Sequence, residues 1–310
     1  MLTGEVVKSH ARSLGFIACG ITDLAPTPHA EQLTAWLASG HAGNMRYLHR
    51  QAKKRKSPSL IEMNAKRAIV VLDNYYSSGS SNSVPRIARY AQGRDYHAVT
   101  RERLERLAEF LRQNGAGVAH AYVDSGPVPE RELAQRAGLG WIGKNTMLIR
   151  PGAGSWCFIG TVLTDLELPI DPPFDTDHCG TCTRCLEACP TAAFPEPRVL
   201  DATHCISYLT IEHRGPIPEP LADLLQGWAF GCDICNEACP WNIRFAEETI
   251  VPGFEPRPRA DRGDPGHFEK LTETEFDAQY GDTPLERPGL GRMRRNWRAA
   301  LRSVGRKAAP

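Results

Sequence analysis

Four cysteines and a proline lie at fixed spacing in the segment CGTCTRCLEACP. The residues are Cys179, Cys182, Cys185, Cys189 and Pro190. Their spacing is that of the bacterial ferredoxin run, and soft thiolate ligands suit iron–sulfur clusters. The segment therefore predicts a site for a 4Fe–4S cluster.

A second cysteine motif, CDICNEACP, is one ligand short of a full run. Cys205 lies between the two motifs and can supply the missing thiolate. In two-cluster ferredoxins the fourth cysteine of a run binds the other cluster, so the eight cysteines divide into two complete sets. The first cluster would bind Cys179, Cys182, Cys185 and Cys239, and the second would bind Cys189, Cys205, Cys232 and Cys235.

Zinc is the alternative metal for closely spaced cysteines. Zinc sites use separate cysteine pairs, whereas three or four cysteines in one tight run followed by proline are typical of iron–sulfur proteins. The two remaining cysteines, Cys19 and Cys157, lie in apolar stretches and are expected in the core. Two neighbouring clusters carry electrons, so the rest of the chain must hold the site that uses them.

The segment before the cysteines alternates between helical and strand patterns, which predicts a mixed α/β domain. Helices are expected over 3–16, 29–40, 99–111 and 129–138. Strands are expected over 17–23 and 68–76, and 117–126 is expected to be a strand that runs into a turn, with Asp124 at the end of the strand. Two more strands are expected inside 146–166, joined by a glycine-containing turn. We divide the chain into an α/β domain (1–168), a ferredoxin-like domain with two clusters (169–246) and a short, basic, helical C-terminal tail (247–310).

Composition sets limits on location and partners. The chain has 310 residues, 41% of them hydrophobic, and a net charge of +1. No apolar run approaches the ~20 residues needed to span a bilayer, and the N-terminus has no signal-peptide pattern. We therefore expect a cytoplasmic monomer without a membrane partner, in which clustered cysteines bind metal rather than form disulfides.

Several segments resemble the epoxyqueuosine reductase family, which consists of cobalamin-dependent iron–sulfur enzymes of tRNA modification. The matching segments extend over almost the whole chain, and the most specific is YVDSGPVPERELAQRAGLGWIGKNTMLI (122–149). The others are KKRKSP (53–58), ARYAQGRDYH (88–97), GSWCFIGTVLT (154–164), CISYLT (205–210) and RRNWRAAL (294–301).

The resemblance implies a mixed α+β cobalamin-binding domain beside the ferredoxin-like domain. The clusters would reduce cobalamin to a nucleophilic, low-valent form. The substrate would be tRNA carrying epoxyqueuosine at the wobble position, and loss of the epoxide oxygen as water would give queuosine in the last step of its biosynthesis. This reaction takes two electrons and two protons, so the resemblance also implies a low-potential electron donor such as flavodoxin or ferredoxin.

Asp124, in the segment YVDSG, matches the proton donor of the family. To hold a proton near neutrality a carboxyl needs a raised pKa, and burial beside an apolar corrin would raise it. The alternative is that Asp124 only caps the turn before Gly126 and Pro127.

Other residues match cofactor and tRNA contacts of the family. The implied cobalamin contacts are Arg55, Ala88, Asp124, Leu148, Ile159, Ser207 and Asp233, with Leu148 and Ile159 on two paired strands. The implied tRNA contacts are His213 and Arg214, for which an exposed loop is the plain alternative. His97 is not assigned as a cobalt ligand, because Thr100 replaces the glycine of the Asp-x-His-x-x-Gly motif.

Two clusters of positive charge suggest contact with RNA phosphates. From Arg287 to the end there are eight Lys or Arg residues and no Asp or Glu, and a second basic cluster covers 53–56. Trp297 and Tyr208 are candidates for stacking on unpaired bases. The alternative for the tail is a solvated helix face.

Three other functions fit parts of the sequence. A cobalamin-dependent reductive dehalogenase would share both cofactors but act on a small organic substrate. The others are an electron-transfer ferredoxin fused to an α/β module and a nucleic-acid-binding protein with structural clusters.

Overall fold

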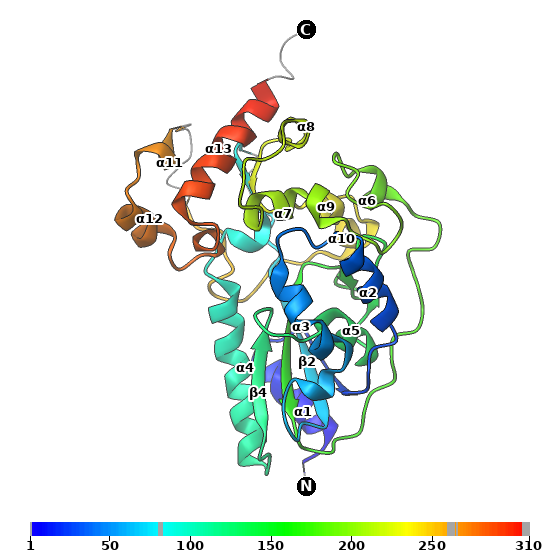
Figure 1. The fold of residues 1–310 in the computed structure, drawn as a ribbon. Helices are drawn as coiled ribbons and strands as arrows, with labels where there is room; N and C mark the ends of the chain where they lie inside the picture. Colours follow the sequence, from blue (N-terminus) through cyan, green and yellow to red (C-terminus); the bar gives the residue numbers. More distant parts are fainter. Residues whose placement is uncertain (1, 80–82, 259–263, 265, 306–310) are drawn as a thin grey trace.

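A four-stranded antiparallel sheet organises the N-terminal half of the computed structural model, which describes residues 2–79, 83–258, 264 and 266–305 (Figure 1). The strand order is β1-β2-β7-β4. The strands are β1 (Ala18–Asp23), β2 (Arg67–Asn74), β4 (Ala119–Val123) and β7 (Cys157–Thr164). Because both faces are covered, the six residues between the ends of β2 are all buried, and all of them except Asp73 are apolar.

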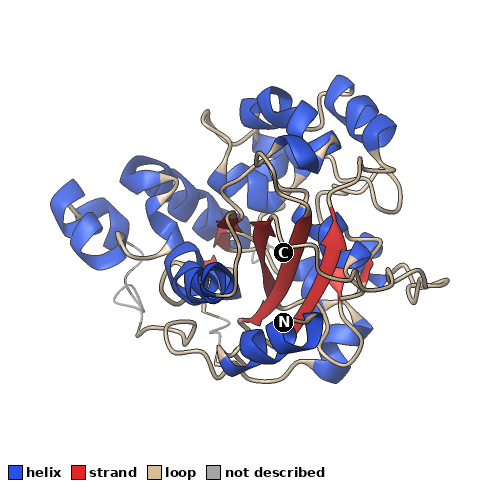
Figure 2. Ribbon diagram, turned by 90° about the horizontal axis from the view of Figure 1, so that it is seen from below, coloured by secondary structure: helices blue, strands red, loops and turns tan. Residues whose placement is uncertain are grey.

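Helices cover both faces of this sheet (Figure 2). On one face α1 (Gly4–Ser13) and α4 (Tyr96–Gln113) pack against alternate residues of β2, including Ile69 and Val71. On the other face α5 (Glu130–Arg136) packs against Val70. This alternation follows from the strand period of two. The C-terminal end of β4 points towards the cysteine region (Figure 1).

Shorter elements complete the part of the chain before the cysteines. They are α2 (Ala30–Ala38), α3 (Arg46–Lys56), η1 (Pro58–Leu60), β3 (Arg86–Ile87), η2 (Arg89–Ala91), β5 (Trp141–Ile142) and β6 (Leu148–Ile149), where η marks a 3₁₀ helix.

The cysteine region consists of short helices joined by loops. Its elements are α6 (Arg184–Glu187), η3 (Ala202–His204), α7 (Ile206–Ile211), α8 (Glu219–Ala222), β8 (Trp228–Phe230), α9 (Ile234–Glu237) and α10 (Pro240–Phe245). After a loop-like segment the chain ends in α11 (His267–Lys270), α12 (Glu273–Tyr280), η4 (Pro284–Glu286) and α13 (Gly289–Gly305).

The C-terminal segment is part of a folded core and not a solvated tail. Helix α13 contacts β8, and β8 pairs in parallel with β3 from the N-terminal half. Trp297 is only 1% exposed in the core cluster that α13 forms with β3 and β8. The expectation that Trp297 stacks on a base is therefore wrong, because its ring is covered by protein.

The helices and strands predicted before the cysteine region are all present, but one predicted pairing is wrong. β6 and β7 do not pair with each other, although an isolated bridge between Arg150 and Gly154 closes the turn between them. Both edges of β7 are already occupied by β2 and β4, so β6 pairs with β5 instead. Among the described residues, no helix has the length and apolarity needed to cross a bilayer.

Candidate active site

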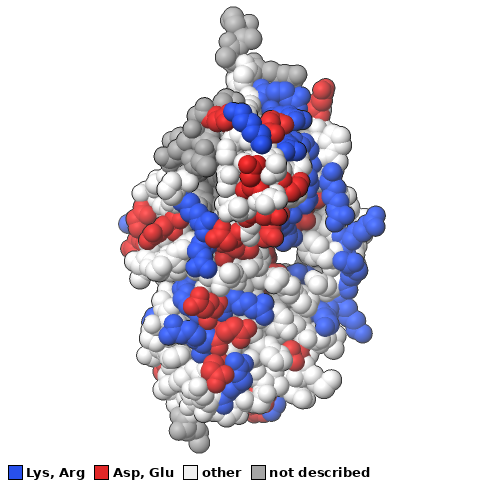
Figure 3. Space-filling model, turned by 90° about the vertical axis from the view of Figure 1, so that its left-hand side faces the viewer, with Lys and Arg blue, Asp and Glu red and all other residues white. Residues whose placement is uncertain are grey.

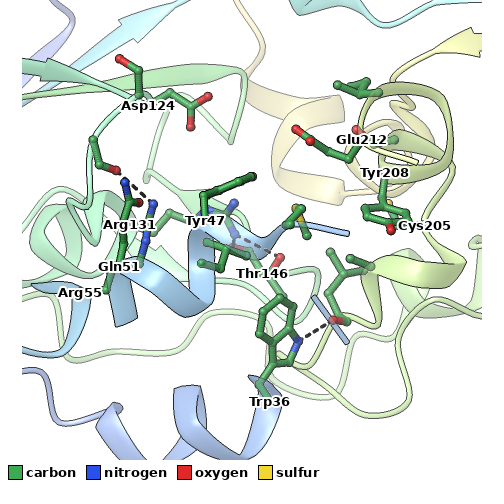
Figure 4. Close-up of a pocket in the computed structure, with 18 of the residues that line it drawn as sticks. Trp36, Tyr47, Gln51, Arg55, Asp124, Arg131, Thr146, Cys205, Tyr208 and Glu212 are labelled. Carbon is green, nitrogen blue, oxygen red and sulfur yellow. Dashed lines mark hydrogen bonds between the residues drawn. The ribbon is translucent and has the colours of Figure 1, made fainter. Parts of the chain in front are cut away.

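A cavity of about 700 Å³ lies where the sheet domain meets the cysteine region (Figure 4). Helix α3 contributes Tyr47 and Arg55, the loop after β4 contributes Asp124, and the segment from η3 to α7 contributes Ser207 and Glu212. Two further cavities, of about 710 and 540 Å³, also include Asp124 in their lining. Each lies within the range of small-molecule sites, and together they suit a ligand larger than a drug-sized one.

Asp124 follows β4 directly and has the left-handed backbone conformation, with φ of 54°. Aspartate tolerates this conformation better than most residues, which places a carboxylate at a sharp turn. The side chain lies at the cavity and is 55% exposed there (Figure 4). Its Oδ2 accepts a hydrogen bond of 2.6 Å from the Tyr96 hydroxyl, so the carboxylate does more than cap its own turn.

His97 connects Asp124 to a second carboxylate. Its Nε2 lies 3.5 Å from Asp124 Oδ2, and its Nδ1 lies 2.8 Å from Asp95 Oδ1. Burial lowers the pKa of His97, but its hydrogen bonds to Asp124 and Asp95 outweigh this and raise the pKa to about 9. His97 is therefore a cation at neutral pH.

The expected raised pKa of Asp124 is not found. Partial desolvation in the cavity raises the pKa of this half-exposed carboxyl, but hydrogen bonds from His97 and Tyr96 outweigh it and lower the pKa to about 2. The raised value belongs to Glu130, where burial and then the charge of Asp124 raise the pKa to about 8. Protons near neutrality are thus held by His97 and Glu130, on either side of an ionised Asp124.

Arg55 reaches from the last turn of α3 to the loop that carries Asp124. It donates to the carbonyl oxygens of Val128, at 3.2 Å, and Gly126, at 3.0 Å. Its Nε is buried and has no hydrogen-bond partner among the described atoms. The positive charge of Arg55 on the wall of a large cavity fits an oxygen-bearing polar group of a bound cofactor.

Of the other implied cobalamin contacts, Ser207 lines the cavity with Asp124. The remaining four are absent from the described lining residues of all three cavities. Leu148 and Ile159 lie in the core beneath α5. Ala88 is fully buried, and Asp233 Oδ2 accepts a hydrogen bond of 2.8 Å from the Arg89 N–H, so these two lie behind the cavity wall.

The four cysteines assigned to the first cluster surround a cavity of about 240 Å³. Zinc would hold its sulfur ligands about 2.3 Å from a single ion, which requires far less space. Trp141 Nε1 donates to Cys179 Sγ at 3.4 Å, a contact of the kind that tunes cluster potentials. The lining thiolates are Cys179, Cys182, Cys185 and Cys239.

The second set of cysteines lies between the first set and the large cavity. Burial raises the pKa of the Cys235 thiol, and the charges of Cys205, Cys185 and Cys189 raise it further, so these sulfurs are close neighbours. Cys232 interacts with Cys205 and Cys235 in the same way. Because Cys205 also lines the large cavity, this set provides a route from the first cysteine cavity towards Asp124.

Comparisons with known proteins identify both halves of this arrangement. The family described as "Epoxyqueuosine reductase QueG, DUF1730" matches residues 55–125, and a "4Fe-4S double cluster binding domain" matches 178–242. An epoxyqueuosine reductase of Pseudomonas aeruginosa is 41% identical over 96% of this chain and 84% of its own length. That of Gloeobacter violaceus is 41% identical over 98% of this chain and 97% of its own length.

The chain belongs to the epoxyqueuosine reductase family. A crystal structure of an epoxyqueuosine reductase with an epoxyqueuosine-modified tRNA-Tyr stem loop has a TM-score of 0.87 to this chain at 28% identity. The similarity covers 96% of this chain and 80% of the other. The resemblance inferred from the sequence is thereby confirmed, as are the mixed α/β fold and the domain for two 4Fe–4S clusters.

Within this epoxyqueuosine reductase fold, the implied tRNA contacts lie on the loop after α7. Arg214 is exposed, whereas His213 Nε2 contacts the Pro216 carbonyl at 2.9 Å. Tyr208 is 7% exposed, and its hydroxyl accepts a hydrogen bond of 2.7 Å from the Asn44 N–H at the cavity. Its ring is therefore fixed in the wall and not free to stack.

Positive charge is distributed differently from the expectation for a basic tail. Figure 3 shows a run of Lys and Arg side chains along one edge of the face, whereas over the rest of it Lys and Arg are interspersed with Asp and Glu. Arg295, on α13, donates to the backbone carbonyls of Leu209 and His213. Arg298 is paired with Glu269, so much of the charge of the tail is already engaged.

Three groups at the site were not assigned from the sequence: Glu130, His97 in contact with Asp124, and the Arg287–Glu212 ion pair on the cavity wall. Glu130 lies inside the most family-specific segment, six residues after Asp124. His97 follows Asp95 and Tyr96, so three polar side chains at the start of α4 were the available signal. Arg287 offered none, because its partner is distant in sequence.

Proposed function

We propose that this chain reduces epoxyqueuosine in tRNA to queuosine, with two 4Fe–4S clusters and cobalamin as cofactors. The observation that carries the proposal is the position of Asp124 in a cavity whose opposite wall includes Cys205. The proposed proton donor, Asp124, and a proposed cluster ligand, Cys205, thus line the same cavity. The family membership of the chain supports the same reaction.

The residues present fit cobalamin. Arg55 and Ser207 would hold it, because both line the cavity and offer a guanidinium charge and a hydroxyl to its polar groups. Cobalamin supplies a low-valent, strongly nucleophilic cobalt when bound. The two cysteine sets would hold the 4Fe–4S clusters that supply electrons, with the set that includes Cys205 beside the cavity and the set around Cys179 farther from it.

The protein's own contribution is to supply protons. Conversion of the epoxide to an alkene and water takes two electrons and two protons, and the oxygen leaves poorly unless it is protonated. Asp124 is placed to protonate that oxygen, which is worth about 10²–10⁴-fold in rate for a positioned acid. Asp124 is ionised at neutral pH, because its pKa is about 2, and His97 Nε2 lies 3.5 Å away as the protonated neighbour that could resupply it.

The proposed reaction requires two partners. The partners are a tRNA carrying epoxyqueuosine and a low-potential donor such as flavodoxin or ferredoxin, and the enzyme would act as a cytoplasmic monomer. The domain limits at 168 and 246 are also part of the proposal. β3 of the first domain pairs with β8 of the second, so the two domains share a two-stranded sheet.

One anaerobic assay tests the proposed reaction. Cluster-reconstituted protein is mixed with cobalamin, a strong reductant and epoxyqueuosine-containing tRNA, and the digested nucleosides are weighed by mass spectrometry. We expect loss of one oxygen that depends on added cobalamin. No conversion, with both clusters and cobalamin shown to be bound, would reject this substrate and favour a dehalogenase-like reduction of a small organic molecule.

A further inference from the structure

The loop between β4 and α5 (residues 124–129) carries Asp124 and is held by side chains from two directions. The Asp124 N–H donates to Glu130 Oε1 at 2.7 Å. On the other side, the Arg55 guanidinium donates to the carbonyls of Gly126 and Val128. Glu130 and Arg55 also interact with each other electrostatically.

The loop packs closely on the strand that precedes it, because a Cβ added to Gly126 would lie only 2.5 Å from Tyr122 Cδ1. The left-handed conformation of Asp124 costs energy that the surrounding contacts must offset. The Asp124 N–H is therefore a point at which one side chain can decide where the carboxylate lies.

We propose that Glu130 is a positioning residue that fixes the Asp124 loop through the Asp124 N–H, with Arg55 as the second half of the clamp. Glu130 acts on the backbone of Asp124, so it need not touch the substrate. The role of Asp124 in catalysis rests on the proposed function, whereas the hydrogen bond from its N–H to Glu130 does not.

The protonation state of Glu130 suits this task. Burial and the charge of Asp124 raise the pKa of Glu130 to about 8, so its carboxyl is largely neutral at pH 7. A neutral carboxyl still accepts a hydrogen bond at its carbonyl oxygen, and it avoids repulsion with the Asp124 carboxylate. Glutamine has the same shape and the same acceptor, so Glu130→Gln imitates the neutral state.

The test measures amide hydrogen exchange in the peptide that contains Asp124, in the cluster-loaded protein and without substrate. We expect Glu130→Ala to speed exchange of the Asp124 amide by about tenfold, as for loss of one hydrogen bond. Glu130→Gln should stay within about twofold of wild type. Glu132→Ala is the matched control, because Glu132 is a buried carboxylate of the same helix that binds Thr27 and Arg136 instead.

Turnover gives the second readout. We expect Glu130→Ala to lower kcat by about 10–100-fold with little change in KM for tRNA, since a displacement near 1 Å can cost about 100-fold. Glu130→Gln should restore most of kcat. Glu130→Asp keeps the carboxyl group but is one methylene shorter, so it should behave like the alanine variant if reach to the Asp124 N–H is what matters.

Two results would overturn the proposal. Unchanged exchange of the Asp124 amide in a folded Glu130→Ala variant would show that the contact does not hold the loop. Normal exchange in Glu130→Gln with kcat as low as in Glu130→Ala would show that Glu130 carries a proton and is not a clamp. If the wild type failed to convert epoxyqueuosine, the exchange result would still decide the clamp, so the two failures are distinguishable.

Discussion

The cysteine region and the Asp124 cavity differ in how they are built. The proposed cluster ligands come mainly from two short runs of sequence, at 179–189 and 232–239, and Cys205 is the single ligand from outside them. The Asp124 cavity combines α3, the loop after β4, the segment around α7 and Arg287 from near the C-terminus. A local motif specifies its chemistry in the sequence, whereas an assembled cavity acquires its chemistry from the fold.

Removing one cluster ligand tests the first half of this comparison and should have the largest effect. Cys205→Ala should lower the iron content from about eight to about four atoms per chain, since each 4Fe–4S cluster needs four thiolates. Turnover should be abolished, because Cys205 lies between the clusters and the cavity. Iron analysis and the assay above measure both.

Cys19→Ala is the control for that variant. Cys19 belongs to neither ligand set and lies in β1, where burial raises the pKa of its thiol to about 12. Iron content and turnover should stay close to wild type. Full iron and full turnover in Cys205→Ala would contradict the assignment of the second cluster.

Asp124→Asn tests the second half of the comparison. It keeps the size of the side chain and removes its ability to donate an acidic proton, so turnover should fall by about 10²–10⁴-fold. The clusters and cobalamin binding should be retained, as followed by absorbance spectroscopy. An active Asp124→Asn variant would remove Asp124 from the mechanism.

The contrast between the two regions also explains what the sequence could and could not predict. The eight cysteines were assigned from spacing, because the pattern Cys-x2-Cys-x2-Cys-x3-Cys-Pro encodes its own geometry. The position of Asp124 at the end of a strand was predicted as well, because β4 follows from local periodicity. The environment of Asp124 was not predicted. Tyr96 and His97 lie on α4, and only the packing of α4 on the sheet brings them to Asp124.

The predictions of a free basic surface on α13 and of pairing between β6 and β7 were wrong for the same reason. The arginines of α13 suggested a free basic surface, but Arg295 and its neighbours are used by backbone carbonyls of other segments. Likewise, β6 and β7 are adjacent in sequence, but the sheet leaves β7 no free edge for β6. Both outcomes depend on contacts between distant segments, which composition and periodicity do not reveal.

The His97–Asp124 contact predicts a pH dependence. The pKa of His97 is raised from 6.5 to about 9, so its stabilising effect is fully present below pH 6.5 and is lost as pH rises through about 9. Wild-type turnover should fall over the same upper range, as His97 loses the proton it supplies. His97→Gln should lower turnover at neutral pH by about tenfold or more and lose this alkaline decline.

Two measurements check this prediction. Turnover is measured against pH for both proteins, and denaturant unfolding is followed at pH 6 and pH 9.5. The difference in unfolding free energy between wild type and His97→Gln should shrink at the higher pH. An alkaline decline that persists unchanged in His97→Gln would assign it to another group, with Glu130 as the first candidate.

The smallest expected effect concerns the two basic segments, which the sequence made look equivalent. Lys53 and Lys54 are exposed in the last turn of α3, the helix whose Arg55 lines the cavity. Replacing both by alanine should weaken tRNA binding several-fold and reduce the salt dependence of log K by about 0.7–0.9 for each phosphate that is no longer neutralised. Arg298→Ala should change neither, because Arg298 is already paired with Glu269.

Binding of the anticodon stem loop is measured at several salt concentrations for both variants. If Arg298→Ala weakened binding more than the double lysine variant, the tRNA would lie along α13 and not across the cavity.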